Sequence, residues 1–383
     1  MNSIAIFGGA GFIGSRVTLA LLEQGHNVKV VDIFDPQIHG LDLAHSETLK
    51  LILGKAPIVV GDIRNPSTVR QALDGVDTVI YLAAGTGTGQ SMYQIKHYVD
   101  VNVGGAAQLA EELVARKDQI RRVVVSSSRA VYGEGAYLCG AHNRVTPTQR
   151  DVAQMQDGRF EPQCPICRGP LKFEASLETD AVAPTSVYGI SKLAQEQLIL
   201  NICGSIKIPA IALRYQNVYG PGQSLKNPYT GILSIFSQLL LQDKEINIFE
   251  DGLATRDFVF IDDIVHYTCA ASASVLSENR ILNVGTGERQ SLLDVVNLLA
   301  VALKKQPRYK ISGQFRLGDI RHASADIREL KRILGSRDMT TFQRGVTQFI
   351  AWASQQNKET DANERYAKSL REMADLGLLK GER

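Results

Sequence analysis

A tyrosine and a lysine spaced four residues apart, Tyr188 and Lys192, are the side chains in this sequence best suited to moving a proton. Residues four apart share one face of a helix. The run SVYGISKLAQEQLIL, residues 186–200, predicts such a helix with Ser186 near its cap. A phenol has a pKa of about 10, which a neighbouring ammonium lowers. The pair can therefore act as a proton shuttle, although the same spacing also occurs on ordinary amphipathic helices.

The first part of the chain predicts the cofactor-binding unit with which such a pair would act. Residues 3–32 read as a strand, a turn, a helix and a second strand. The turn contains Gly8, Gly11 and Gly14, which let a pyrophosphate approach the backbone N–H groups at a helix N-terminus. Asp32 ends the second strand, where a carboxylate takes the ribose hydroxyls and repels a 2′-phosphate. The pattern therefore predicts bound NAD rather than NADP.

The alternation of strands and helices continues beyond this unit. Strands are predicted at 58–60, 78–82 and 122–125, and small or polar residues follow each of them. Ligands bind at such strand ends in open α/β sheets. Two of the candidates have ordinary alternatives, since Asp62 could be a plain loop aspartate and Asn102 a plain helix residue. Besides Tyr188 and Lys192, the predicted cofactor contacts are Gly8, Gly11, Phe12, Ile13, Gly14, Asp32, Asp62, Ile63, Leu82, Ala83, Ala84, Asn102 and Gln216.

A serine triplet, Ser126 to Ser128, follows the predicted strand 122–125. Hydroxyl groups at this place are well positioned for hydrogen bonds to a ligand. No histidine or acid stands nearby in the sequence to make a serine nucleophilic. We therefore exclude a hydrolase triad.

Several motifs occur in one order along the chain: GGAGFIG, the acid at Asp32, GDIR, LAAG, SSSRAVYG, the Tyr188–Lys192 pair, LRYQNVYGPGQ and RDFVFIDD. This set resembles the extended short-chain dehydrogenase/reductase superfamily, in particular its nucleotide-sugar epimerases and dehydratases, over approximately residues 1–350. The resemblance implies a Rossmann domain with bound NAD. It also implies a smaller C-terminal domain that holds a nucleoside-diphosphate sugar.

The resemblance implies a role for each matching residue. Tyr188 would be the catalytic base, Lys192 would lower its pKa and bind ribose, and Ser128 would hydrogen-bond the reacting sugar hydroxyl. For the charged loop residues, the plainer alternative is a surface charge. The implied substrate contacts are Thr86, Ser128, Asn217, Arg256, Arg316 and Asp319.

Two positions narrow the reaction that the resemblance implies. The 4,6-dehydratases of the superfamily carry an Asp-Glu pair just after the catalytic hydroxyl residue, whereas this chain has Arg129 and Ala130. Without those acids the chain resembles the 4-epimerases, which need one base and a cofactor that is reduced and reoxidised in place. The run TGTGQSMY at 86–93, GDIRHASAD at 318–326 and a long insertion between Ser128 and Tyr188 are also similar to a bacterial group of dTDP-L-rhamnose 4-epimerases, which make dTDP-6-deoxy-L-talose for cell-surface polysaccharides.

Other functions stay open at this point. One is a UDP-hexose or UDP-N-acetylhexosamine 4-epimerase, and another is a reductase or dehydrogenase of the same nucleotide sugars. A third, of a different class, is a non-catalytic dinucleotide-binding sensor or scaffold. The presence of Tyr188, Lys192 and Ser128 argues against a scaffold, which has no need of them.

An insertion separates the serine triplet from Tyr188, and it is longer than the resemblance leads one to expect. It contains Cys139-x-x-His142 and Cys164-x-x-Cys167. Three cysteines and a histidine in two such half-sites predict a tetrahedral structural zinc site. A segment with so few large apolar residues needs a bound metal ion to stabilise its fold. The alternatives are unrelated free cysteines or a Cys164–Cys167 disulfide.

The 383 residues are 44% apolar and 21% charged with a formal net charge of +2, which is ordinary for a globular protein with a sizeable core. We see no dense basic stripe for nucleic acid and no membrane span. Five unevenly placed cysteines and the absence of room for a signal peptide predict a cytoplasmic protein. The resemblance adds a homodimer.

We therefore expect an α/β fold, a Rossmann doubly wound parallel sheet with a smaller C-terminal substrate domain and a zinc-ribbon-like insertion. The Rossmann domain should span 1–213, with the insertion at 135–173. The substrate domain should span 214–355, with 257–287 returning to the Rossmann domain. Residues 356–383 should form a charged tail, read as a solvated or loosely docked helix.

Overall fold

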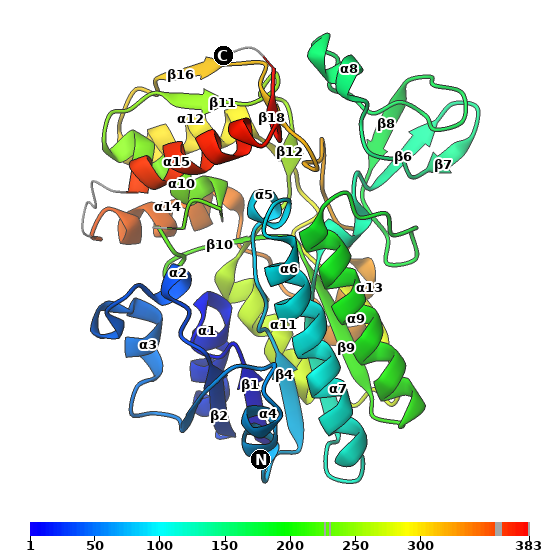
Figure 1. Cartoon of the computed structure of the whole chain (residues 1–383), viewed down its shortest axis with the longest axis vertical. Coiled ribbons are helices and arrows are strands. Elements are labelled where there is room, and N and C mark those ends of the chain that lie inside the picture. Colours follow the sequence, from blue (N-terminus) through cyan, green and yellow to red (C-terminus); the bar gives the residue numbers. More distant parts are fainter. Residues whose placement is uncertain (226, 230, 357–361, 382–383) are drawn as a thin grey trace.

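The computed structural model describes residues 1–225, 227–229, 231–356 and 362–381. Its centre is a seven-stranded parallel sheet in the order β14-β9-β5-β4-β1-β2-β3 (Figure 1). Apart from the edge strand β3, whose Val60 is exposed, the strands are short, largely apolar runs buried on both faces, which is typical of parallel sheets. Their bounds are β1 Ser3–Phe7, β2 Asn27–Asp32, β3 Ile58–Val60, β4 Thr78–Tyr81, β5 Arg122–Ser128, β9 Ala210–Tyr215 and β14 Arg280–Val284.

Helices cover both faces of the sheet, because side chains alternate along each strand. Ile4 and Ile6 of β1 pack toward α1 (Phe12–Glu23), α11 (Ile261–Ala273) and α13 (Arg328–Leu334). Ala5 and Phe7 pack toward α4 (Pro66–Leu73), α7 (Gly105–Ala115) and α9 (Val187–Ser205). This arrangement confirms the predicted Rossmann fold. Short helices in the connections are α2 Pro36–His39, η1 Leu43–His45, α3 Glu47–Ile52, α5 Thr88–Ser91, α6 Ile95–Tyr98, η2 Val99–Gly104 and η3 Arg129–Tyr132.

A second, smaller lobe lies above the carboxyl ends of the strands in Figure 1 and has its own apolar core. Its helices are α10 Ile232–Leu241, α12 Leu292–Leu303, α14 Phe342–Ala353 and α15 Ala362–Asp375. Its strands form two-stranded pairs: β10 Asn217–Tyr219 with β13 Phe258–Phe260, β11 Ile246–Ile248 with β16 Tyr309–Ile311, β12 Thr255–Arg256 with β15 Gln290–Ser291, and β17 Phe315–Arg316 with β18 Leu379–Lys380.

The C-terminal tail is docked onto this lobe. Helix α15 packs against α10 and buries Met373, which is 3% exposed. Its Glu372 accepts a hydrogen bond from the Tyr93 hydroxyl at 3.2 Å. Strand β18 pairs antiparallel with β17. The tail is therefore part of the packed structure rather than a solvated helix, and residues 357–361 lie outside the described residues.

The insertion forms a separate small sheet that projects beside the second lobe (Figure 1). Its antiparallel strands, in the order β7-β6-β8, are β6 Ala136–Cys139, β7 Asn143–Val145 and β8 Leu171–Glu174, and it also contains α8 Val152–Gln156. In the part of the chain that the structure describes, no helix is both long and apolar enough to span a membrane.

Candidate active site

The predicted cofactor residues gather at the carboxyl ends of strands β1, β2, β3, β4, β5 and β9, as expected for a doubly wound sheet. The turn after β1 fits a dinucleotide on its geometry. A Cβ at Gly14 would lie 2.1 Å from the Gly8 carbonyl oxygen, so the backbone here is closer than any side chain allows. Gly8 also has a φ of +76°, which favours glycine. Helix α1 therefore begins directly at a tight glycine turn, where its first N–H groups have no partner within the helix.

Asp32 ends β2 and is buried beside this turn. Its carboxylate accepts hydrogen bonds from the backbone N–H groups of Ala10 and Phe34, both at 3.0 Å. The His39 ring nitrogen Nε2 lies 3.6 Å from Asp32 Oδ1. We did not predict His39, because a lone histidine in a loop gives no sequence signal. The carboxylate is thus held rigidly in the place where a ribose would bind.

Asn102 and Gln216 are buried amides, but only Gln216 has an atom without a hydrogen-bond partner. Asn102 uses its side chain within the chain, since it accepts from Gly85 N–H at 2.7 Å and donates to Ser191 Oγ at 2.9 Å. It therefore joins the loop after β4 to α9. Gln216 lies after β9, is 5% exposed, and its Oε1 has no hydrogen-bond partner. A buried acceptor without a partner is costly, which fits a bound group that donates to it.

Tyr188 lies in the first turn of α9, which Ser186 caps by accepting from Gly189 N–H at 3.1 Å. The capping prediction is therefore confirmed. The Tyr188 ring packs edge-on against Tyr98, with ring centroids 6.4 Å apart. Burial raises the pKa of Tyr188, whereas a hydrogen bond with Ser128 and the positive charge of Arg129 lower it. The structure thus brings Ser128 and Tyr188 together as predicted.

Lys192 is 2% exposed and lies one turn further along α9. Its ammonium donates to the Ser126 carbonyl oxygen at 2.6 Å and to Gln195 Oε1. Burial lowers the pKa of Lys192 to about 7, and Glu196 opposes that shift. We expected Lys192 to be the cation that lowers the pKa of Tyr188. In this structure, Arg129 has that effect.

Only one of the three serines at the end of β5, Ser128, hydrogen-bonds with Tyr188. Ser126 donates to the Tyr81 carbonyl oxygen at 3.2 Å, and Ser127 donates to Glu196 at 2.5 Å. Glu196 of α9 is therefore an acid close to the serines that their sequence neighbourhood does not reveal. Its position, four residues after Lys192, was a usable signal. Glu196 forms a buried ion pair with Arg214 of β9 at 2.6 Å, so it holds α9 against β9.

Charged residues of the second lobe converge opposite Tyr188. Asp319 lies between Arg256, at 2.9 Å, and Arg316, at 2.8 Å. Burial would raise the pKa of Asp319, but Arg316, Arg256 and Arg129 hold it well below its usual range. Arg129 donates to Asn217 Oδ1 at 2.9 Å, and burial together with Arg256 lowers its pKa to about 10. Three cations therefore surround one carboxylate.

The predicted substrate residues do not all join this group. Arg256, Arg316, Asp319 and Asn217 are brought together, with Arg129 as the member that we did not predict. Thr86 lies in the exposed loop after β4, and its backbone carbonyl accepts from the Tyr98 hydroxyl at 2.9 Å. Arg129 directly follows Ser128, and this adjacency was a signal of its position.

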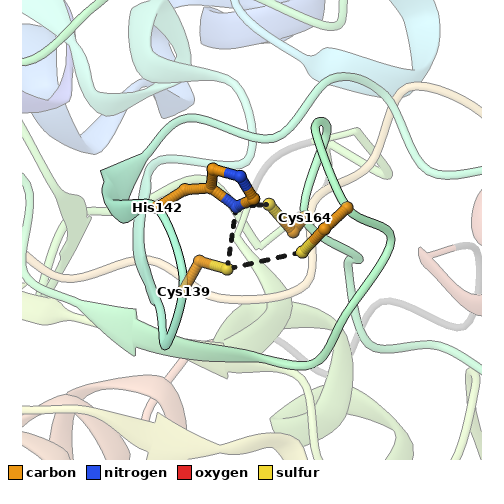
Figure 2. A group of neighbouring side chains, drawn as sticks. Cys139, His142 and Cys164 are labelled. Atoms are coloured by element: carbon orange, nitrogen blue, oxygen red, sulfur yellow. Dashed lines mark hydrogen bonds between the residues drawn. The ribbon is translucent and has the colours of Figure 1, made fainter.

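The four predicted metal ligands form one cluster in the insertion. Their ligand atoms all lie within 4.8 Å of one another. Figure 2 shows Cys139, His142 and Cys164 directed toward a common point. The Cys139 sulfur is 3.5 Å from His142 Nδ1 and 3.7 Å from the Cys167 sulfur, and the Cys164 sulfur is 3.7 Å from His142 Nδ1. The Cys164–Cys167 disulfide is not formed, since both cysteines are free.

The fold and the site together are those of a dinucleotide-binding enzyme with a tyrosine and a buried lysine one turn apart on helix α9. Residues 4–153 and 162–285 match the NAD dependent epimerase/dehydratase family. The chain is 36% identical to a dTDP-L-rhamnose 4-epimerase of Burkholderia thailandensis, over 93% of this chain and 96% of the relative. This chain belongs to the NAD dependent epimerase/dehydratase family.

Other relatives are more distant but cover the chain equally well. A putative UDP-glucose 4-epimerase of Methanocaldococcus jannaschii is 28% identical over 93% of this chain and 99% of the relative. A solved structure of the Bacillus cereus UDP-glucuronic acid 4-epimerase, in complex with UDP-glucuronic acid and NAD, is 26% identical with a TM-score of 0.74. It covers 92% of this chain and 99% of its own.

Proposed function

We propose that this chain is an NAD-dependent nucleotide-sugar 4-epimerase. The observation that carries the proposal is the cluster of Arg129, Arg256 and Arg316 around Asp319, in which Arg129 directly follows Ser128 and also interacts with Tyr188. Buried cations in excess of their carboxylate need an anion. A diphosphate supplies that charge and can carry a sugar on one side and a nucleoside on the other. A nucleoside-diphosphate sugar bound there would therefore have its sugar beside the tyrosine.

The residues at the strand ends would hold the cofactor. Gly8 and Gly14 permit the tight turn at which a pyrophosphate would meet the N-terminus of α1, Asp32 would take the ribose hydroxyls, and the unpartnered Gln216 Oε1 would accept from the nicotinamide amide. When bound, NAD supplies a reversible hydride acceptor. Lys192 would bind the adjoining ribose, as the resemblance implies.

The chain's own chemistry is proton transfer. Ser128 would hold the sugar 4-hydroxyl, and Tyr188 would take its proton as C4 becomes a ketone. The 4-keto sugar would then turn over in the cleft. With NAD bound, hydride would return to the opposite face of C4 while Tyr188 returns the proton to the C4 oxygen, and this change of face would invert the stereochemistry. No acid is needed beyond Tyr188, which agrees with Arg129 and Ala130 at the places where dehydratases carry acids.

For the sugar itself, we propose dTDP-L-rhamnose, converted to dTDP-6-deoxy-L-talose, on the strength of the 36% identical relative. UDP-sugars are the second candidates, because the more distant relatives act on them. A reductase or dehydrogenase of the same sugars is distinguished by net consumption of reduced cofactor during turnover. Homodimerisation and a cytoplasmic location remain expectations from the sequence.

The decisive experiment incubates the NAD-loaded protein with a panel of dTDP- and UDP-sugars and follows the sugar ring protons by NMR. We expect inversion at C4 of one or a few of them without net change in cofactor redox state. If no sugar in the panel is isomerised, the proposed function is wrong. Sustained NADH oxidation would instead favour the reductase.

The field of Arg129 gives a prediction for the pH dependence of turnover. The base must be deprotonated to act, so kcat should rise with pH until Tyr188 has lost its proton. Removing a positive neighbour raises the pKa of a phenol. In Arg129→Met, the rising limb of the kcat profile should therefore move to higher pH, by about one unit.

Arg64→Met is the control for that shift, because Arg64 is exposed and paired with Asp62. Its pH profile should coincide with that of the wild type. An unchanged limb in Arg129→Met would show that another cation sets the pKa of Tyr188.

We also propose that the insertion holds a structural zinc ion on Cys139, His142, Cys164 and Cys167. With zinc–sulfur bonds of about 2.3 Å and zinc–nitrogen bonds of about 2.0–2.1 Å, tetrahedral coordination separates neighbouring donors by about 3.5–3.8 Å. The closest donor pairs here are 3.5 Å and 3.7 Å apart. All four positions would be filled by the protein, so the ion would be structural.

Cys164→Ser tests the metal site directly. We expect the wild type to contain about one zinc per chain, and the variant to lose it and to be cut within the insertion by proteases, because the strands lose their staple. Cys203→Ser is the matched control, since Cys203 is a buried cysteine on α9 far from the cluster in sequence. Elemental analysis and limited proteolysis give the measurements. A folded, metal-free wild type would rule out the zinc site.

A further inference from the structure

The segment 315–322 carries two members of the charged cluster, Arg316 and Asp319, yet has little regular structure of its own. Only its first two residues belong to a strand, β17. Its position must therefore be set by what packs against it. The insertion supplies contacts along this whole segment.

The first contact is apolar. The Phe160 ring of the insertion lies 6.5 Å from the Phe315 ring, centroid to centroid. Met155 of α8 completes this small core, and all three side chains are buried. Because Phe315 directly precedes Arg316, this core fixes the start of the segment.

The remaining contacts are polar and fix the far end of the segment. Glu134, which directly precedes the insertion, accepts from the backbone N–H of Arg321 at 2.9 Å. Glu161 pairs with the Arg321 side chain at 2.7 Å. Glu161 also lies 3.2 Å from His322 Nε2. The insertion therefore holds the segment on both sides of Asp319.

Arg150 connects these contacts to Asp319 itself. Its guanidinium donates to the Asp319 backbone carbonyl at 3.1 Å and to the Phe160 carbonyl at 3.1 Å. It also pairs with Glu134 at 2.9 Å and with Glu250 at 2.8 Å. The side chain is only 2% exposed. A planar fork with five N–H groups can bind this many acceptors at once, and an ammonium cannot.

The metal cluster ties together the parts of the insertion that make these contacts. Cys139 ends β6, the strand that follows Glu134, and Cys164 follows closely after Phe160 and Glu161. An ion bound by Cys139 and Cys164 would hold these two regions in one unit. The position of the segment would then depend on the ion.

We propose that the metal-closed insertion positions the nucleotide-sugar site, with Arg150 as the positioning residue that transmits its geometry to Asp319. The inference rests on the proposed function for its ligand, a nucleoside diphosphate. Arg150 touches neither sugar nor cofactor. Arg150 holds the backbone of Asp319, whose carboxylate orients Arg256 and Arg316. It therefore governs binding of the diphosphate rather than proton transfer at Tyr188.

The test measures binding of dTDP and of UDP to the NAD-loaded protein by titration calorimetry. Arg150→Lys keeps the charge beside Glu134 and Glu250 but loses the fork. We expect about tenfold weaker binding of the nucleoside diphosphate, because the hydrogen bond from Arg150 that orients the Asp319 backbone is lost. KM for the sugar nucleotide should rise similarly, with kcat, NAD content and metal content unchanged. Arg159→Lys, an exposed arginine of the same insertion, should match the wild type.

Metal removal can be combined with Arg150→Lys in a double-perturbation cycle. A purely structural role of Arg150 would not give the result expected from that cycle. Removing the metal from the wild type should weaken binding as Arg150→Lys does, and removing it from Arg150→Lys should add little, because both act through one contact. Additive losses, or a fall in kcat at constant KM, would overturn the inference. If dTDP binding responds as predicted but no sugar is isomerised, the proposed function alone fails. A wild type that binds neither dTDP nor UDP overturns both.

Discussion

Replacing Tyr188 with phenylalanine should lower kcat by about 10³-fold, because it removes the only group that we place to take the 4-hydroxyl proton. The ring should keep its edge-on contact with Tyr98, so the fold and the cofactor site should be undisturbed. We therefore expect the variant to retain NAD and to bind dTDP with wild-type affinity. Steady-state kinetics and the NAD released on denaturation give the two measurements.

Tyr137→Phe is the matched control for this substitution. Tyr137 is 1% exposed in β6, and its hydroxyl has no hydrogen-bond partner, so its loss should leave both activity and stability close to the wild type. A Tyr188→Phe enzyme with kcat within tenfold of the wild type would mean that another group moves the proton. A loss of bound NAD in the variant would instead assign Tyr188 a structural role.

Replacing Arg321 with methionine should lower the free energy of unfolding by about 3–5 kcal/mol, the largest stability effect that we predict. Arg321 is 1% exposed and pairs with Glu250 at 2.9 Å, with Asp251 at 2.6 Å and with Glu161 at 2.7 Å. Methionine fills a similar volume but leaves Asp251 without its cation, while Glu250 keeps only Arg150 and Glu161 keeps only His322. Breaking one side of a buried ionic network is costly for that reason.

Arg328→Met provides the comparison for Arg321. Arg328 also pairs with a carboxylate, Asp326 at 2.7 Å, but its side chain is 83% exposed. Its replacement should change the free energy of unfolding by less than about 1 kcal/mol. Chemical denaturation of both variants checks the contrast. Similar midpoints for Arg321→Met and the wild type would show that water screens the network.

The parts of the site that could be predicted are those with local signals. Gly8, Gly14 and Asp32 lie within one strand–turn–helix–strand unit, and a short spacing pattern places them all. The same holds for Tyr188 and Lys192 on one helix. The metal ligands also come as two local pairs, so their meeting needed only that the insertion close on itself.

The parts that could not be predicted depend on contacts between distant segments. Glu134 and Arg321 are 187 residues apart and meet only because the insertion docks beside the second lobe. Arg150 has no pattern around it that distinguishes a buried arginine from a surface one. The orientation of Lys192 toward Ser126 follows from side-chain packing, which helical spacing does not describe.

The insertion also has a consequence for how the chain reaches its fold. It lies between β5 and β9, which are neighbours in the sheet. Pairing those strands closes a loop of 81 residues, 129–209, and prior closure of the insertion on itself would shorten the free loop by about 40 residues. Loop-closure entropy varies so slowly with length that this changes the cost by only about 0.6 kcal/mol. The junction is therefore thermodynamically tolerant of modules of very different size.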